Sequence, residues 1–466
     1  MNHRTARLAI GMALLFLASA ALFWPGYVQY DSLAQYEQAL AGRYEDWHPP
    51  VMAHLWALFG ARGQAPMMLL QLAGYWLGFG VLIVMLAAIG RRVAALALLV
   101  VALWPPFLGW QPVVLKDTQM LAALLAATGL VAMWQLCERR VPVGVWIVVA
   151  LLLGYAMLVR ANAVFAVVPF AVMLVWRRPQ PTPPIRIVLA ALLALVAILA
   201  VIGIAGPINH RLLAATPSGV ERTQPTYDLA GIAVRSGDSA TGLSARAIDA
   251  LRRKVCVRPY FWDPLGEPRR CQSEVATLVT LSPGQLYVRW ATAAVTHPIA
   301  YVGHRLAHLN STLRWLVPFR WPGAAPPQAN EPNSLGLASP AARATRWQTV
   351  AATLVETPFG WPVVWFVMAL IRLPAAWRRT DGAGRLAAAM LVSALALEGS
   401  FAVLSIASDL RYHLWPMIAT AIAWVLVGRV RVARPALVLL ALILFAGLIA
   451  RVVLPAPPQT YVGMLG

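Results

Sequence analysis

Carboxylates gather in one short stretch of a strongly basic chain, QYDSLAQYEQALAGRYEDWHPP at residues 29–50. Four of the protein's 18 acids lie there, although the net charge is +20: Asp31, Glu37, Glu45 and Asp46. Asp31 comes about seven residues after an apolar run long enough to cross a membrane, so we expect it at the membrane surface. Partial loss of hydration there raises the pKa of a carboxyl and makes it a better base. The alternative is a helix N-cap, because Asp31 precedes the helical pattern SLAQYEQALAG.

The same stretch ends in His-Pro-Pro at residues 48–50. The two prolines fix φ and hold His48 in an extended conformation, and they favour a helix in the VMAHLWALFG that follows. This rigidity aims Asp46, Trp47 and His48 at one spot, although taken alone it is equally explained as a rigid loop end. We therefore expect Asp31, Asp46 and His48 as catalytic candidates.

Three polar segments lie at the ends of later apolar runs: Lys116-Asp117, Arg160 with Asn162, and Arg411 with Tyr412 and His413. Cations at a membrane interface suit an anionic lipid headgroup, and arginine can grip a phosphate through two hydrogen bonds. The alternatives are snorkelling of each cation to the interface and a simple ion pair between Lys116 and Asp117. Three such segments beside a carboxylate-rich loop favour a substrate-binding site.

A base beside phosphate-binding cations is suited to group transfer from a lipid phosphate. The base removes the proton of an attacking hydroxyl. A phosphate leaving group needs no proton from the enzyme when cations hold its charge. On this interpretation the acids serve the acceptor and the cations serve the donor.

The elements that position these residues are membrane helices. Hydrophobic residues make up 60% of the chain and charged residues 12%, with a mean hydropathy of +0.67, whereas a soluble domain carries about twice that charge. We predict an all-α polytopic membrane protein with about eleven spans of about 20 residues. The expected spans are 8–24, 66–89, 93–110, 118–136, 143–159, 163–176, 185–206, 350–371, 384–408, 413–428 and 435–454.

Arginine clusters fall in every second connection between these runs: Arg4/Arg7, Arg91/Arg92, Arg139/Arg140, Arg177/Arg178/Arg186, Arg372/Arg378/Arg379/Arg385 and Arg429/Arg431/Arg434. The positive-inside rule then places the N-terminus inside and the C-terminus outside, in a bacterial inner membrane. The candidate site residues all fall on the opposite, periplasmic face. The basicity thus indicates membrane anchoring, and no nucleic-acid-binding motif is found.

We expect three regions: an N-terminal membrane module at 1–206 with a catalytic loop at 25–65, an outer region at 207–349, and a C-terminal membrane module at 350–466. Within the outer region, residues 209–285 are predicted to form a small lobe and residues 286–322 helices at the membrane surface. Cys256 and Cys271 flank a short segment on the oxidising side and are candidates for a disulfide, the alternative being two free thiols. The cysteines fit no zinc spacing, and no metal site is predicted.

At these residues the chain resembles the GT-C superfamily of polytopic glycosyltransferases, which use polyprenyl-phosphate sugars. The resemblance rests, in order along most of the chain, on YDS with Asp31, HPP at 48–50, KD at 116–117, RAN at 160–162 and DLRYH at 409–413. It implies a GT-C-like bundle, a polyprenyl-phosphate-linked sugar donor, and a glycan or lipid acceptor in contact with membrane lipids. It also implies that Asp31 is the general base and that Lys116, Arg160 and Arg411 surround the donor phosphate. Many members have a second acid beside this Asp, where Ser32 stands here, so no cofactor is expected to be required and a divalent cation is doubtful.

Two other classes of protein share this polytopic pattern. A transporter or lipid flippase typically carries ionisable groups near the middle of the membrane, and here only Glu398 lies clearly within a span. A polysaccharide polymerase or ligase also joins many spans to a long outer region. The early acidic loop and HPP favour the glycosyltransferase.

Overall fold

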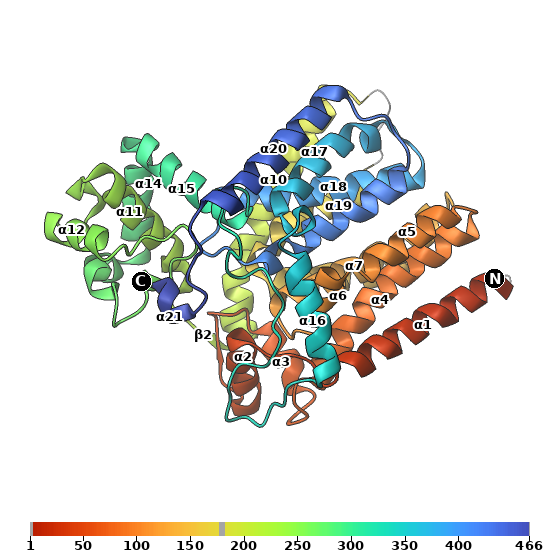
Figure 1. Cartoon of the computed structure of the whole chain (residues 1–466), viewed down its shortest axis with the longest axis horizontal. Coiled ribbons are helices and arrows are strands. Elements are labelled where there is room, and N and C mark those ends of the chain that lie inside the picture. Colours follow the sequence, from red (N-terminus) through yellow and green to blue (C-terminus); the bar gives the residue numbers. More distant parts are fainter. Residues whose placement is uncertain (1–2, 177–181, 466) are drawn as a thin grey trace.

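The computed structural model describes residues 3–176 and 182–465, and its regular structure is almost entirely helical (Figure 1). Within these residues seven helical segments are long and apolar enough to cross a membrane: Thr5–Phe23 in α1 (His3–Phe23), α4 (Ala65–Ala88), α7 (Lys116–Gln135), Pro184–Leu212 beginning with α10 (Pro184–Pro207), α18 (Gly382–Ser400), Leu410–Val427 containing α19 (Leu414–Val427), and α20 (Arg434–Val453). Shorter apolar helices are α5 (Arg92–Ala102), α8 (Val143–Val159) and Ala161–Val175 containing α9 (Val164–Val175). The predicted helical fold, with several helices long and apolar enough to cross a membrane, is confirmed, whereas the count of about eleven spans and the GT-C-like bundle stay predictions.

Prolines divide two of the predicted spans. The run at 93–110 splits into α5 and a short α6 (Pro105–Trp110), because proline cannot donate its backbone hydrogen bond and disfavours helix in the preceding residue. The predicted span at 350–371 begins too early in the sequence. Its first residues belong to α16 (Ala342–Leu354), and the apolar helix α17 (Pro362–Arg378) starts at Pro362.

The helices α4 and α7 pack closely enough to exclude side chains at their crossing. A Cβ atom added to Gly78 would lie 2.4 Å from the carbonyl oxygen of Leu125, and one added to Gly129 would lie 2.9 Å from the Cα of Gly78. Small residues let helix backbones approach in this way within membranes. The contact fixes the position of α7 along the axis of α4, and with it the position of Lys116, the first residue of α7.

The outer region forms a lobe with a hydrophobic core of its own (Figure 1). Its main helices are α11 (Thr223–Ser236), α12 (Ala245–Arg253), α14 (Pro283–Thr296) and α15 (Pro298–Thr312). The predicted disulfide between Cys256 and Cys271 is present and both sulfurs lie in this core. The segment predicted as surface helices at 286–322 contributes α14 and α15, which pack against α11, and ends in irregular structure.

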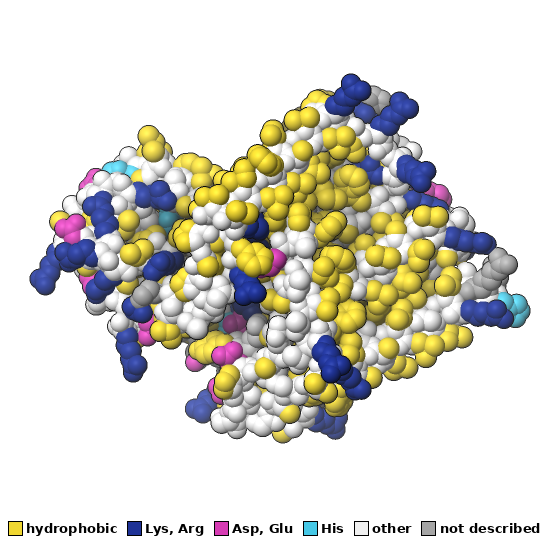
Figure 2. All heavy atoms as spheres, in the orientation of Figure 1, with side chains coloured by type: hydrophobic (Ala, Val, Ile, Leu, Met, Phe, Trp, Pro, Cys, Tyr) yellow, Lys and Arg dark blue, Asp and Glu magenta, His cyan; other side chains and the backbone are white. Residues whose placement is uncertain are grey.

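The two termini lie at opposite ends of the molecule in Figure 1. Figure 2 shows hydrophobic side chains over the long helices, with Lys and Arg side chains at the end that carries the N-terminus and on the lobe. Of the predicted inside arginines, Arg177 and Arg178 lie outside the described residues. The sidedness of the protein stays a prediction.

Candidate active site

Two backbone segments far apart in sequence pair beside the site. The Tyr27 amide donates to the carbonyl of Pro112 at 2.9 Å, and the Val114 amide donates back to Tyr27 at 2.9 Å. The Ser32 hydroxyl then donates to the Val114 carbonyl. The first turn of α2 (Tyr30–Ala41) is thereby held against the first turn of α7.

A layer of buried amide side chains packs beneath this first turn of α7, on the side of α4 and α8. Gln71 on α4 accepts hydrogen bonds from Thr118 at 3.2 Å and from Gln119 at 3.0 Å, and donates to the Val113 carbonyl at 2.8 Å. Tyr155 of α8 donates to Gln119 at 3.2 Å. Buried polar groups satisfied by one another specify a single arrangement, so the amide layer sets where Lys116 and Asp117 point.

Asp31 is surrounded by the predicted cations. Its Oδ2 lies 3.1 Å from Nη2 of Arg411 and 3.9 Å from Nζ of Lys116. Its Oδ1 lies 3.9 Å from Nε2 of His48. Residues from the first loop, from α7 and from the turn before α19 therefore meet at one carboxylate, which is 17% exposed.

Arg411 lies among three carboxylates. Its Nη2 contacts Asp31 and also Oδ2 of Asp409 at 3.2 Å, while its Nε lies 3.6 Å from Oδ2 of Asp117. Gln29 accepts from Nη1 at 3.2 Å. The acids and cations thus interleave, so they do not separate into an acceptor half and a donor half as the sequence suggested.

Arg160 completes the cluster from the tip between α8 and α9. Its Nη1 lies 2.7 Å from Oδ1 of the buried Asp117, and its Nε donates to Asn162 at 2.9 Å. The guanidinium stacks over the ring of Tyr412, 4.2 Å from the ring centroid. Arg160 is itself buried, so interfacial snorkelling does not describe it.

The pKa of the Asp31 carboxyl differs from the sequence prediction. Burial alone raises this pKa, as expected, but the positive charges of Arg411 and Lys116 outweigh burial and hold the pKa well below its usual range. The N-cap of α2 is Gln29, whose backbone amide donates to the Ser32 hydroxyl. Asp31 is in the first turn, and its carboxylate serves the cation cluster rather than the helix cap.

His48 offers an unused donor to the site. Lys116 donates to its Nδ1 at 2.7 Å, and an ammonium has no lone pair to accept, so the ring proton lies on Nε2. That Nε2 is buried and has no hydrogen-bond partner among the described residues. Burial and the Lys116 charge lower the pKa of His48 to about 3, which keeps the imidazole neutral.

Two predicted residues lie apart from this cluster. Asp46 accepts hydrogen bonds from the backbone amide and the hydroxyl of Ser218, both at 2.6 Å, and lies 3.4 Å from Nε2 of His210. Together with the two-residue strands β1 (Tyr44–Glu45) and β2 (Ala215–Thr216), it ties the first loop to the chain after α10. The prolines therefore do not aim Asp46 and His48 at one spot.

His413 also makes its contacts away from the cluster around Asp31. Its Nδ1 lies 2.8 Å from Oε2 of Glu398, and its Nε2 lies 3.0 Å from the Thr312 hydroxyl. All three side chains are buried. Glu398, the acid that the sequence places clearly within a predicted span, therefore has His413 as its partner.

The lobe helix α15 holds the segment that carries Arg411. Its Arg305 donates to the carbonyls of Phe401, Ala402 and Ser405 in the turn that follows α18. One and two turns further on, His308 contacts the Ser405 hydroxyl at 2.9 Å, and Ser311 donates to the Ser408 hydroxyl at 2.8 Å. The following residues, Asp409 and Arg411, are positioned by these contacts.

Sequence reasoning missed four side chains beside the cluster: Gln29, Tyr260, Asp263 and Asp409. Tyr260 donates to Oδ1 of Asp409 at 3.4 Å, and Tyr461 donates to Oδ2 of Asp263 at 3.1 Å. Burial raises the pKa of Asp263 to about 6. Two of the four had a signal in the sequence, since Asp409 is part of the DLRYH motif and Gln29 lies two residues before Asp31. The two lobe residues, Tyr260 and Asp263, had no such local signal.

No group of three or more His, Cys, Asp or Glu side chains is placed to hold a metal ion in the described part of the chain. The three carboxylates of the site face Arg411 instead. Comparison of the chain with protein-family models, curated proteins and solved structures found no match.

Proposed function

We propose that the chain is a membrane glycosyltransferase that moves a sugar from a polyprenyl-phosphate donor to a hydroxyl of a glycan or lipid acceptor. The observation that carries this proposal is the direct contact of Asp31 with Arg411 and Lys116. It puts a candidate base and two phosphate-binding cations in one cluster, at the ends of apolar helices. A lipid phosphate lies at that level of a membrane.

The ion pair couples the two halves of the reaction. When the acceptor hydroxyl attacks the sugar carbon, its proton passes to Asp31 and the electron pair of the sugar–oxygen bond passes to the phosphate, which gains one negative charge. Protonation of Asp31 removes its negative charge from beside Arg411 and Lys116, although Asp409 and Asp117 still contact Arg411. Both cations then interact more strongly with the phosphate at the step in which its charge rises.

Donor binding prepares Asp31 for this role. A base whose pKa is held low by cations is weak. A donor phosphate that engages Arg411 and Lys116 offsets their charge, which raises the pKa of Asp31 towards that of an ordinary carboxyl. His48 assists, since a hydroxyl beside the pair accepts from its free Nε2–H and donates to Oδ1 of Asp31.

Binding of a polyprenyl phosphate to the purified protein tests the donor site. We expect Lys116→Ala, Arg160→Ala and Arg411→Ala each to weaken binding by about 1.5–3 kcal/mol, the value of a hydrogen bond to a charged group. Arg411→Lys should restore only part, because lysine lacks the planar fork of donors. Equal affinity in all variants and wild type would show that the cations only hold the carboxylates.

A transporter is the second candidate, and one observation favours it. Glu398 and His413 form a buried pair within apolar helices, the kind of group that proton-coupled transporters use. On this alternative, reconstituted protein moves the lipid across vesicles without forming a new glycosidic bond. The glycosyltransferase forms that bond.

A further inference from the structure

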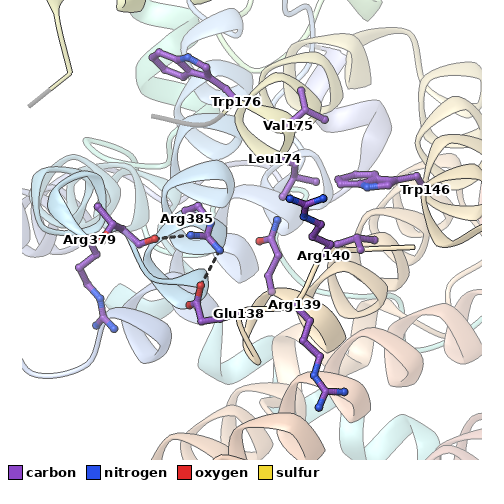
Figure 3. Close-up of a pocket in the computed structure, with 12 residues that line it drawn as sticks. Glu138, Arg139, Arg140, Trp146, Leu174, Val175, Trp176, Arg379 and Arg385 are labelled. Atoms are coloured by element: carbon purple, nitrogen blue, oxygen red, sulfur yellow. Dashed lines mark hydrogen bonds and ion pairs between the residues drawn. The ribbon is translucent and has the colours of Figure 1, made fainter. Parts of the chain in front are cut away.

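A second cluster of cations lines a cavity at the other end of the helices, away from the candidate active site. The cavity has a volume of about 660 Å³ and lies among the ends of α7, α8, α9, α17 and α18 (Figure 3). Four arginines line it: Arg139, Arg140, Arg379 and Arg385. The positive-inside rule predicts this end to be cytoplasmic.

The acids at this end are already engaged. Asp381 receives both hydrogen bonds of the Arg379 guanidinium fork and caps α18. Glu138 lies 3.1 Å from Nη2 of Arg385 and accepts from the amide of Gly382. These two acids therefore neutralise two of the four arginines.

The other two arginines keep their charge. Across residues 3–176 and 182–465, no hydrogen bond or ion pair reaches the guanidinium of Arg139 or Arg140. Figure 3 shows Arg140 extending between Leu174 and Trp146, while Arg139 extends away from them. Arg140 thus places an unneutralised charge beside apolar side chains within the cavity.

The cavity opens next to an exposed apolar surface. Val175 lines it and is 66% exposed, and the neighbouring Val143 and Ile147 of α8 are 76% and 57% exposed. Trp146 and Trp176 also line the cavity, and tryptophan favours the membrane–water interface. A ligand that fills both parts has an anionic head and an apolar tail.

We propose that this cavity binds the phosphate headgroup of an anionic membrane phospholipid, with Arg140 as its main contact. The phosphate lies at Arg140, and the acyl chains follow Trp146 and the exposed face of α8. Basic pockets between membrane helices on the cytoplasmic side bind such headgroups. A free phosphate ion would use the charge but leave the apolar side uncovered.

Native mass spectrometry of the delipidated protein in detergent tests the proposal with phosphatidylglycerol as the probe. We expect one bound phosphatidylglycerol, held at least about tenfold more tightly than zwitterionic phosphatidylethanolamine. Arg140→Gln should lower the affinity about tenfold, the effect of one charge-assisted hydrogen bond. Arg92→Gln is the matched control, because Arg92 is an exposed arginine at the same end but does not line the cavity.

Three results would overturn the proposal. Equal binding of phosphatidylglycerol by Arg140→Gln and wild type would show that Arg140 does not contact the headgroup. An equal loss of affinity in Arg140→Gln and Arg92→Gln would show that the lipid is held only by general charge attraction. Displacement of the lipid by millimolar inorganic phosphate would identify a site for a free anion.

Discussion

Replacing Asp31 with Asn should change sugar transfer and donor binding in opposite directions. The distances in the structure set the attraction between Asp31 and each of the two cations, Arg411 and Lys116. At an effective dielectric constant of about 20, each attraction amounts to roughly 4–5 kcal/mol before desolvation is counted. The variant releases this attraction on both cations. If a bound phosphate recovers only about 1.4 kcal/mol of it, the donor binds about tenfold more tightly.

The transfer rate should fall in the same variant. Asn cannot take the proton of the acceptor, so we expect a loss of about 10²–10⁴-fold in the single-turnover rate at saturating donor, the usual effect of removing a positioned base. Asn also leaves the shape of the side chain unchanged. Helix α2 should persist because Gln29, rather than Asp31, is its N-cap.

Asp46→Asn is the matched control for this experiment. It makes the same change in the same loop, but its carboxylate contacts Ser218 and His210 rather than the cation cluster. We expect some loss of stability, about 1 kcal/mol for a hydrogen bond, and a transfer rate within about twofold of wild type. Weaker donor binding by Asp31→Asn, or transfer above about a tenth of the wild-type rate, would refute the role of Asp31 as a base that competes for the cations.

Three further predictions concern the scaffold. Gly78→Leu should lower the thermal unfolding temperature, because the new side chain overpacks α4 against α7 at a cost of about 1–3 kcal/mol or more. Gly154→Leu is the control and should leave the unfolding temperature unchanged, since a Cβ there meets no atom within 4 Å. Equal unfolding temperatures of the two variants would contradict the close crossing. Burial and the Arg305 charge lower the pKa of His308 to about 3 in the folded lobe, so the unfolded chain, with a pKa of about 6.5, binds the proton first. Stability is therefore lost as the pH falls below about 6.5, by about 2 kcal/mol at pH 5, and denaturant titrations of His308→Gln should show a shallower pH dependence than wild type. A cysteine introduced at Gln328 should react with an impermeant thiol reagent from the periplasmic side, and reaction only from the cytoplasm would reverse the predicted sidedness.

The helical tips of the site could be predicted because each interrupts an apolar run. A lysine or arginine between two membrane helices is a local signal, and Lys116, Arg160 and Arg411 do meet in one cluster. Which cation contacts which carboxylate is a matter of distance in space. The sequence therefore predicted a raised pKa for Asp31 from burial, and the structure reverses the direction by placing Arg411 beside it.

The partners of Asp46 and His413 could not be predicted for the same reason. Ser218 lies 172 residues from Asp46 in sequence. Glu398 is 15 residues from His413, and the predicted span at 384–408 continued through residues 401–408, where the chain leaves the helix instead. The start of α17 had a readable signal in the Trp-Pro at residues 361–362, which the apolar run around it concealed.

The central claim is that this site transfers a sugar, and product analysis tests it most directly. Purified protein in vesicles is given a defined polyprenyl-phosphate sugar labelled in the sugar, together with a hydroxyl-bearing glycan or lipid acceptor fraction. We predict labelled acceptor and free polyprenyl phosphate with wild type and with Asp46→Asn, and loss of both products with Asp31→Asn. Movement of the intact labelled lipid across the vesicle membrane, with no labelled acceptor across a panel of donors, would contradict the claim and identify a transporter.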